Sequence, residues 1–172
     1  MTNCTFCEII EKKYNLLYED EKVFAMLHPN PASAGHIILL PKEHHPILEQ
    51  VPDYVVSELF SKANKLSIAV FEAFGAHGTN LIIQNGIAAG QKHSHVMLHI
   101  IPRFQNDGLN LLWQPKQLSE EQMSTAEIAL KESTKGVGEF EKEKAKPIET
   151  KEPEKLSQEK EDYLLKQLKR MP

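Results

Sequence analysis

This sequence has little of several features that would assign a chain to a common class. Its 20 lysines and arginines are outnumbered by 24 aspartates and glutamates, giving a net charge of -4 and a pI near 6.1. That balance argues against general binding to nucleic acid, which needs a basic surface. No apolar run approaches the length of a membrane span, and the N-terminal residues lack the basic start and apolar stretch of a signal peptide. We therefore expect a cytoplasmic protein that makes no use of a membrane.

Cysteine is almost absent, because the 172 residues include only Cys4 and Cys7. In a reducing compartment a Cys-x-x-Cys pair is more often half of a metal site, or a redox pair, than a structural disulfide. A tetrahedral metal site needs two further ligands from elsewhere in the chain.

The order of apolar residues predicts one long helix and several short strands. Residues 53–74 place apolar side chains at three- and four-residue steps, as an amphipathic helix does, with Pro52 and Asp53 as its N-cap and Gly75 as its stop. A short helix is expected at residues 4–13. Apolar runs bounded by turns predict strands at residues 23–27, 36–40 and 79–84, and a further strand through the histidines at 93–99.

The character of the chain changes after residue 116, where acids and bases alternate densely and histidines are absent. We expect a domain at residues 1–116 and a charged, partly helical extension at 117–172. Ser119 and Gln122 form a capping-box pattern for a helix to about Glu132. Residues 136–153 are predicted to be disordered because they bury too little apolar surface, and residues 157–170 are predicted to form a closing helix.

The stretch from Gly90 to Arg103 holds three histidines at alternate or near-alternate positions. On a strand, His93, His95, Met97 and His99 share one face, and the mostly apolar residues between them share the other. Imidazole suits proton transfer, metal binding or nucleophilic attack near neutral pH. A polar, solvated strand face is the alternative, but three imidazoles after a glycine-rich turn favour a functional site.

These residues resemble the histidine triad (HIT) family, whose signature is His-x-His-x-His followed by two apolar residues. The flanking Gly90-Gln91 and Ile100-Ile101-Pro102-Arg103 place His95 at the first histidine of the signature, Met97 at the second and His99 at the third. Further similarity extends over roughly residues 4–103, at Cys4–Ile10, Pro31–His36, Pro41–His44 and Gln84–Gln91.

The resemblance implies an α+β fold, in which an antiparallel sheet of about five strands carries the long helix across it. It also implies a homodimer that joins two sheets edge to edge, which would cover an exposed strand edge. The apolar segment Leu109–Trp113 is a candidate for the dimer contact.

Zinc-containing members of the family hold the metal with two cysteines, a histidine after the second strand and the first histidine of the signature. The resemblance therefore implies a structural Zn²⁺ site made by Cys4, Cys7, His44 and His95, which is a closed Cys₂His₂ set. Neighbouring residues point in different directions, so only one of His44 and His45 is expected to ligate the metal.

In the family the middle histidine attacks the α-phosphorus of a nucleotide, and water or another acceptor releases the product. The resemblance implies a purine nucleotide ligand, such as AMP or a dinucleoside polyphosphate. The implied nucleotide-binding residues are Gln84, Asn85, Gln91, Lys92 and His28, and the implied catalytic set is His36, His99 and the position of Met97. A thioether is a weak nucleophile for phosphorus, so we expect activity to be reduced or lost.

Two further positions depart from the family pattern. Lys92 stands where the family commonly has serine or threonine beside the phosphate, and His28 stands where many members have an acidic residue that contacts the ribose. On a continuous strand His93 lies about 14 Å from Met97, too far to replace it as the nucleophile.

Three other readings remain open at this point. The first is an active nucleotide hydrolase that uses His99 or a water molecule, and the second is a protein that acts by binding a partner through its C-terminal extension. The third is a copper site made by His93, His95, Met97 and His99, since thioether and imidazole suit Cu(I).

Overall fold

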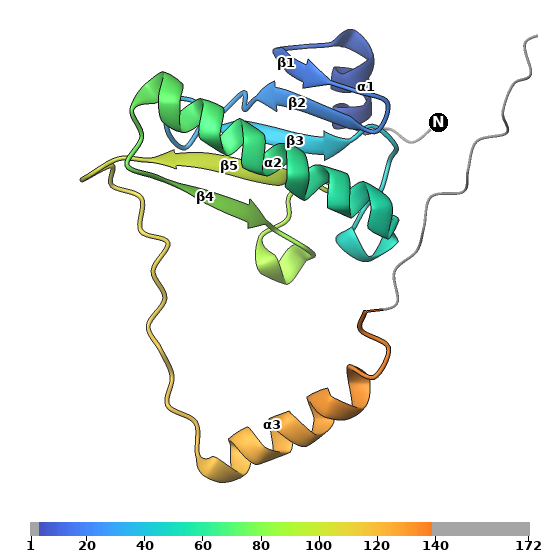
Figure 1. Ribbon diagram of the computed structural model, residues 1–172, viewed down its shortest axis with the longest axis vertical. Helices are drawn as coiled ribbons and strands as arrows, with labels where there is room; N and C mark the ends of the chain where they lie inside the picture. Colours follow the sequence, from blue (N-terminus) through green and yellow to red (C-terminus); the bar gives the residue numbers. More distant parts are fainter. Residues whose placement is uncertain (1–3, 139–172) are drawn as a thin grey trace, which may run out of the picture. The chain divides into compact units, whose positions relative to one another are not determined.

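The computed structural model describes residues 4–138, whose main elements follow the order α1, β1, β2, β3, α2, β4, β5, α3 (Figure 1). The five strands are β1 (Leu16–Glu19), β2 (Val23–Leu27), β3 (Ile37–Pro41), β4 (Gly78–Ile83) and β5 (Leu98–Arg103). They form one sheet in the order β1-β2-β3-β5-β4, and every neighbouring pair is antiparallel. The predicted α+β fold with a five-stranded antiparallel sheet is confirmed.

Helix α2 (Asp53–Phe74) crosses one face of this sheet, as its three- and four-residue apolar pattern predicts (Figure 1). It buries Val55, Leu59, Ala63 and Val70 against the sheet. Gly75 ends the helix in the left-handed conformation, with φ 61°. The expected side-chain N-cap is absent, because Pro52 occupies the cap position and has no side-chain acceptor to offer.

Helix α1 (Thr5–Lys12) lies on the other side and buries Phe6 and Ile10. The two sides of the sheet therefore carry separate cores. Alternating residues of β2 and β3 contribute to each: the α2 side takes Val23, Ala25, Ile37 and Leu39, and the α1 side takes Phe24, Met26, Ile38 and Leu40. Burial on both faces explains why these strands are nearly continuous apolar runs.

The predicted strand through residues 93–99 is only partly present. Strand β5 begins at Leu98, and the residues before it form bends. The expected alternation still holds from residue 96 onward, because Val96, Leu98 and Ile100 pack in the α2-side core while Met97 packs against the α1-side core.

Side-chain hydrogen bonds replace strand pairing in the segment that precedes β5. Gln91 accepts a hydrogen bond from Gly86 N at 2.7 Å through Oε1, and its Nε2 donates to Pro46 O at 2.7 Å and His93 O at 2.8 Å. Gly90 adopts φ +90°, and a Cβ on it would lie 2.7 Å from Gln84 Nε2. The chain can therefore fold closely around Gln91 only with glycine at position 90.

Beyond β5 the structure continues through irregular chain to helix α3 (Glu120–Ser133). The predicted capping box is confirmed, because Ser119 Oγ accepts from Gln122 N and Gln122 Oε1 accepts from Ser119 N. Helix α3 buries no residue. The predicted helix at 157–170 lies outside the described residues, as does most of the predicted disordered stretch at 136–153. No helix within residues 4–138 is both long and apolar enough to cross a membrane.

Candidate functional site

Two groups of side chains on the α1 side of the sheet bring chemistry together. The first, which we call the thiol cluster, consists of Cys4, Cys7, His44 and His95. Nδ1 of His95 lies 3.7 Å from Sγ of both cysteines, and Nδ1 of His44 lies 3.4 Å from Cys7 Sγ. Residues about ninety positions apart in the sequence thus meet in a small volume.

The donor atoms of the thiol cluster have the spacing of zinc ligands. Tetrahedral bonds of ~2.3 Å to sulfur and ~2.1 Å to nitrogen hold neighbouring sulfur and nitrogen ligands ~3.6 Å apart. The three observed sulfur–nitrogen distances of 3.4, 3.7 and 3.7 Å bracket that value. The residues present therefore fit a Cys₂His₂ zinc ion.

His95 is also prepared as a ligand by its second ring nitrogen. Its Nε2 lies 2.9 Å from Pro41 O, and a carbonyl oxygen only accepts, so Nε2 carries the proton. The lone pair is therefore on Nδ1, which faces the two sulfurs. Burial lowers the pKa of His95, which is fully buried, and this favours the neutral form that metal binding requires.

The structure also distinguishes His44 from His45 as a possible metal ligand. His44 contributes a ring nitrogen to the thiol cluster, whereas His45 does not. Within the described part of the chain, the buried Nε2 of His45 has no hydrogen-bond partner. The main chain of His45 is engaged, because its carbonyl accepts from Val96 N at 2.7 Å.

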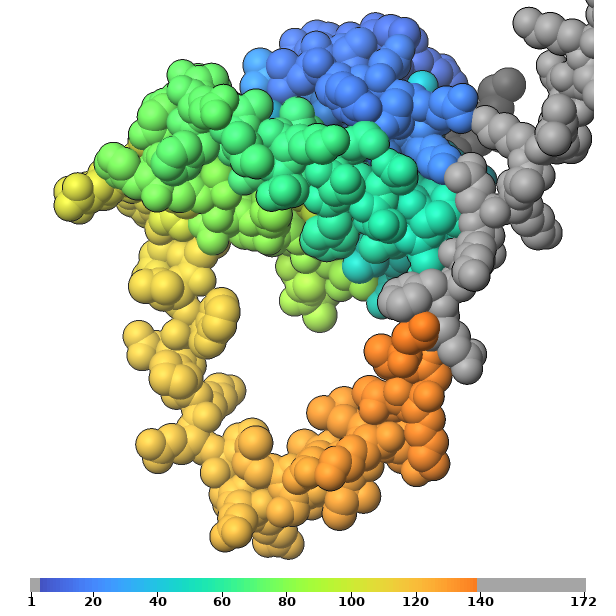
Figure 2. Space-filling model, viewed as in Figure 1, coloured from blue at the N-terminus to red at the C-terminus, as the bar shows by residue number. Residues whose placement is uncertain are grey.

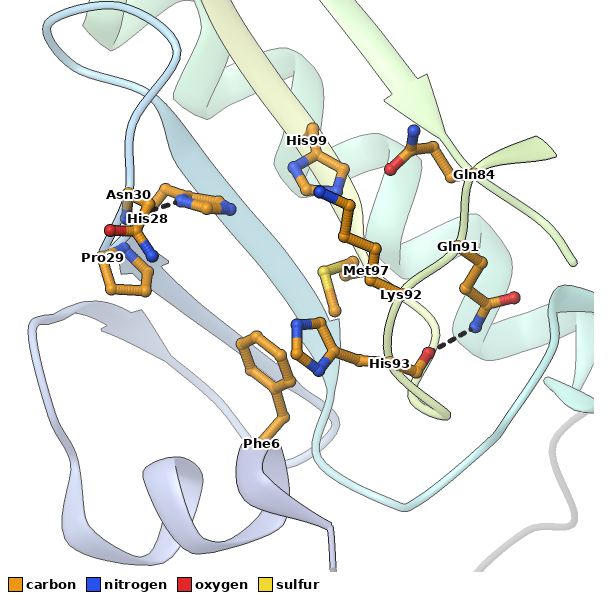
Figure 3. A pocket seen from close by; sticks show the side chains of 10 residues that line it. All are labelled: Phe6, His28, Pro29, Asn30, Gln84, Gln91, Lys92, His93, Met97 and His99. Atoms are coloured by element: carbon orange, nitrogen blue, oxygen red, sulfur yellow. Dashed lines mark hydrogen bonds between the residues drawn. The ribbon is translucent and has the colours of Figure 1, made fainter. Parts of the chain in front are cut away.

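The second group lines a cavity of about 330 Å³ that opens between α1, the chain after β2, and the loop before β5 (Figure 3). Among the described residues, its lining contains no aspartate or glutamate. The lining residues are Phe6, His28, Pro29, Asn30, Gln84, Gln91, Lys92, His93, Met97 and His99.

Behind this cavity His36 connects to His99. His36 Nδ1 accepts from Ala32 N at 3.0 Å, and His36 Nε2 lies 3.1 Å from His99 Nδ1. Burial lowers the pKa of both His36 and His99 to about 4, with smaller contributions from neighbouring histidines including His28. Both rings are therefore neutral near pH 7.

A neutral imidazole carries a single proton, so the nitrogen that accepts a hydrogen bond must be the unprotonated one. Because His36 Nδ1 accepts, its proton is on Nε2, which then donates to His99 Nδ1. The proton of His99 is consequently on its own Nε2. The same reasoning applies to His28, whose Nδ1 accepts from Asn30 N at 3.0 Å. We call His28, His36 and His99 the imidazole cluster.

The imidazole cluster is close enough to resemble a metal site, since one ring nitrogen of each residue lies within 4.8 Å of the others. A metal ion, however, needs a lone pair from each ring. In His28 and His36 the lone pair is already used by a backbone N–H, and in His99 it is used by His36. This cluster is therefore built to donate hydrogen bonds rather than to bind a cation.

The structure brings most of the predicted residues of the nucleotide site together. Gln84, Gln91, Lys92, His28, Met97 and His99 line the cavity, and His36 stands behind His99. Asn85 does not line it. Its Oδ1 accepts from Leu48 N and its Nδ2 donates to Glu49, so it fastens the loop before α2.

Sequence reasoning missed four lining residues, Phe6, Pro29, Asn30 and His93. The argument that placed His93 about 14 Å from Met97 assumed a continuous strand. Because the chain bends between residues 91 and 97, His93 lines the same cavity as Met97 and contacts the Phe6 ring edge-on, at 5.0 Å between centroids. The copper site is wrong as a single set, because His95 belongs to the thiol cluster.

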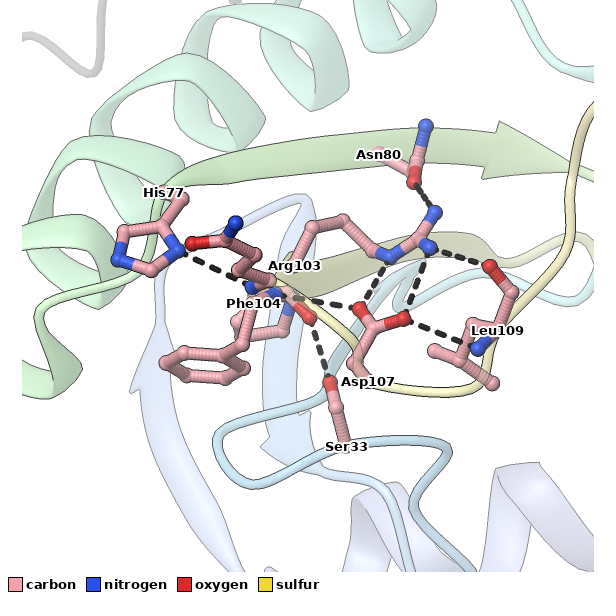
Figure 4. A network of polar contacts seen from close by, with 9 residues as sticks. Ser33, His77, Asn80, Arg103, Phe104, Asp107 and Leu109 are labelled. Carbon is pink, nitrogen blue, oxygen red and sulfur yellow. Dashed lines mark hydrogen bonds and ion pairs between the residues drawn. The ribbon is translucent and has the colours of Figure 1, made fainter.

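A separate polar network anchors the chain after β5 (Figure 4). The Arg103 guanidinium donates twice to Asp107, at 2.6 and 3.0 Å, and once to Asn80 Oδ1 on β4 at 2.7 Å. The hydrogen bond from Arg103 holds the pKa of Asp107 well below its usual range. This pairing fixes the end of β5, on which His99 is carried.

Comparison with known proteins places this geometry in a family. The HIT domain model matches residues 10–106. Adenylylsulfatase HINT3 of Arabidopsis thaliana is 42% identical over 118 residues, which cover 67% of this chain and 58% of that protein. Bis(5'-adenosyl)-triphosphatase of Dictyostelium discoideum is 31% identical over 107 residues, covering 62% of this chain and 72% of that protein.

Solved structures agree with these matches. A HIT family protein from Bacillus anthracis superposes with a TM-score of 0.71 at 31% identity, covering 77% of this chain and 97% of that one. A zinc-bound histidine triad family protein from Mycobacterium smegmatis gives a TM-score of 0.60 at 29% identity, covering 77% and 97% respectively.

Proposed function

Since this chain belongs to the HIT family, we propose that its cavity binds an adenine nucleotide and that catalytic turnover there is reduced or lost. The chain matches 58% of the length of the HINT3 relative, so that protein's activity as a whole does not carry over by similarity alone. Both named enzymes among the relatives act on adenylyl compounds, which supports an adenine nucleotide as the ligand.

The observation that carries the proposal is Met97. Its thioether lines the cavity two residues before His99. The register of the sequence resemblance assigns this position to the nucleophilic histidine of the family. A neutral thioether is a poor nucleophile toward phosphorus and has no proton to transfer. The residues that recognise the ligand therefore remain, while the residue that forms the covalent bond does not.

His99 does not replace the missing nucleophile. Its Nδ1 accepts from His36, and its Nε2 carries a proton, so no nitrogen of His99 offers a free lone pair to the cavity. His99 is instead suited to donate a hydrogen bond from Nε2 to a phosphoryl oxygen. Lys92 supplies a positive charge in the same lining.

One observation favours a second candidate function, an active hydrolase that uses His93. Its imidazole lines the cavity beside Met97. In this case the bend before β5 would bring His93, four residues before Met97 in the sequence, to the cavity as the nucleophile. The experiment below distinguishes the two functions.

We also propose that the thiol cluster holds a structural zinc ion. The support is the spacing of its sulfur and nitrogen atoms, the proton on His95 Nε2, and the zinc-bound relative. With four protein ligands the site leaves no open position, so zinc there supplies folding energy rather than chemistry.

A homodimer joined through β4 is the third part of the proposal. Strand β4 is an edge of the sheet, and an unpaired edge favours pairing with another chain. Large apolar side chains are exposed on α2, whose outer surface faces the viewer in Figure 2, and on β4 beside it. They are Phe60, Ile68, Phe71, Phe74 and Leu81. Exposed apolar residues at Leu111–Trp113 could extend this contact.

The test compares the native chain with Met97→His. We expect both proteins to bind AMP, as measured by calorimetry, and only the variant to hydrolyse a nucleoside phosphoramidate at an appreciable rate. Restoring a catalytic nucleophile is expected to raise the rate by about a hundredfold or more. A nucleotidyl-enzyme intermediate should be trapped chemically on the variant alone.

The matched controls are His93→Ala in both backgrounds. If the native chain turns over robustly and His93→Ala abolishes that turnover, the second candidate function is correct. If the native chain fails to bind AMP, the nucleotide-binding proposal itself is wrong.

A further inference from the structure

The thiol cluster joins three parts of the chain that are far apart in the sequence. Cys4 is the N-cap residue of α1 and Cys7 is the third residue of that helix, whereas His44 follows β3 and His95 precedes β5. Helix α1 has only eight residues, and a helix of that length is not stable by itself in water. Its position therefore depends on the packing of its apolar side chains and on the two sulfur ligands that it contributes to the proposed zinc site.

Phe6 connects this part of α1 to the nucleotide cavity. It lies between the two cysteines in the sequence, and its ring lines the cavity and contacts the His93 ring edge-on (Figure 3). His93 is two residues before His95, so both sides of this contact are attached to the thiol cluster through a short length of chain. A change that releases α1 from His95 is therefore expected to separate the two sides of this cavity wall.

The two thiols are placed to form a disulfide with each other. Cys4 and Cys7 are not joined by a disulfide, and their sulfur atoms lie within 4.8 Å of each other. Residues three positions apart on a helix have Cα atoms about 5 Å apart, which is within the range that a disulfide spans. Cys7 is partly exposed whereas Cys4 is buried, so a small oxidant reaches the Cys7 sulfur first.

We propose that the thiol cluster is a redox-sensitive switch, in which a peroxide converts Cys4 and Cys7 to a disulfide, zinc is released and nucleotide binding weakens. This inference rests on the proposed function, because it uses both the zinc site and the nucleotide site, and it adds the regulation of the second by the first. Binding is tight in the reduced, zinc-loaded chain and weaker in the oxidised chain.

The oxidation transfers two electrons from sulfur to hydrogen peroxide. The Cys7 thiolate attacks one peroxide oxygen, the O–O bond breaks, and Cys7 becomes a sulfenic acid while hydroxide leaves. The Cys4 thiolate then attacks the Cys7 sulfur, expels a second hydroxide and forms the S–S bond. Two protons from solvent convert the two hydroxides to water. Neither sulfur of a disulfide carries a negative charge, so only His44 and His95 remain as ligands and α1 is no longer tied to them.

The experiment treats the full chain, reduced and loaded with zinc, with hydrogen peroxide. Because the chain contains only two cysteines, a thiol assay and the intact mass report directly on this pair. We expect both thiols to disappear with a loss of two hydrogen atoms, and a coloured chelator to detect about one released zinc per chain. The Kd of AMP, measured by calorimetry, should rise by about three- to tenfold. Dithiothreitol with added zinc should reverse all of these changes.

Two variants and one further readout separate the switch from other effects of peroxide. Phe6→Leu should still form the disulfide and release zinc, but its AMP affinity should change by less than about twofold on oxidation, because the connecting ring is gone. Tyr14→Leu, at an exposed position after α1, should respond as the native chain does. Met97 in the cavity is a second target of peroxide, but its sulfoxide adds an oxygen to the mass and is not reversed by dithiothreitol.

The inference is overturned if the thiols stay reduced, if they form disulfides between chains, or if the disulfide forms and AMP affinity does not change. It is also overturned if the reduced chain holds no zinc, or if dithiothreitol and zinc do not restore AMP binding. If the reduced, zinc-loaded chain binds no AMP, the proposed function is wrong and the inference fails together with it.

Discussion

The thiol cluster and the imidazole cluster use the same side chain for opposite purposes. His95 and His99 are four residues apart and lie on the same side of the sheet, yet His95 turns a lone pair inward while His99 turns an N–H toward the cavity. The difference comes from the backbone group that hydrogen-bonds to the far side of the ring in each cluster. Behind His95 is the carbonyl of Pro41, which holds the ring proton. In the imidazole cluster the N–H of Ala32 occupies the lone pair of His36 Nδ1. His36 Nε2 therefore donates to His99 Nδ1, and the proton of His99 lies on its own Nε2.

This comparison shows that a count of histidines does not identify a metal site. Both clusters bring three or more potential ligands within 4.8 Å. Only the thiol cluster directs its free electron pairs inward, and only the imidazole cluster is complementary to an anion. A single backbone carbonyl or amide behind the ring decides between the two kinds of chemistry.

The largest effect is expected from breaking the thiol cluster. Metal analysis of the native protein should find about one zinc per chain. Cys4→Ser should lose that zinc and lower the melting temperature by about 10 °C or more, because binding of a structural metal is coupled to folding. His45→Gln is the matched control, and it should keep its zinc. If the native protein contains no zinc and melts at the same temperature as Cys4→Ser, the zinc assignment is refuted.

A smaller effect is expected on nucleotide binding beside the imidazole cluster when the metal is removed from the thiol cluster. Phe6 lies between Cys4 and Cys7 in the sequence, lines the cavity, and contacts His93, which is two residues from His95. Removal of zinc by a chelator should therefore loosen this wall and raise the Kd of AMP by about three- to tenfold.

Two variants sharpen this prediction. Phe6→Leu in the zinc-loaded protein should weaken AMP binding similarly, while Tyr14→Leu, at an exposed position after α1, should not. If chelation leaves the affinity for AMP unchanged while Phe6→Leu weakens it, the two clusters are independent of each other.

The smallest effect is expected from the C-terminal extension. We propose that residues 1–116 are sufficient for nucleotide binding, because α3 buries no residue. A chain cut after Lys116 should keep its AMP affinity within about twofold and remain a dimer by light scattering. Loss of the dimer on truncation would instead indicate that the extension packs on the domain and contributes to its folded state.

The order of residues was sufficient to predict strands β2, β3 and β4, helix α2 and the capping box at Ser119, because burial patterns and local turn and capping residues can be read directly from the sequence. The five-stranded antiparallel sheet was predicted through resemblance, and its edge strand β1 was not predicted from the residues. The gathering of Cys4, Cys7, His44 and His95 was predicted through resemblance rather than periodicity. The bend before β5 could not be predicted in this way, since it depends on the Gln91 side chain, which accepts a hydrogen bond from Gly86 N and donates to the carbonyls of Pro46 and His93.

The roles of the Asn85 and His28 side chains could not be predicted from the sequence either. Asn85 was assigned to the ligand, but its amide is used by Leu48 and Glu49, which lie far away in the sequence. For His28, the identity of the residue gave no indication of which nitrogen carries the proton. That information lies in the backbone N–H of Asn30, whose position depends on how the chain turns after β2.

Imidazole ¹⁵N NMR of the zinc-loaded protein, recorded as a function of pH, tests the contrast between the clusters most directly. The account predicts that His36 and His99 carry protons on Nε2 and unprotonated nitrogens at Nδ1, and that both remain neutral at pH 5–6, because their pKa values are lowered to about 4. His44 and His95 should show metal-bound Nδ1. A His99 that carries its proton on Nδ1, or that titrates near the ordinary pKa of ~6.5, would contradict the account.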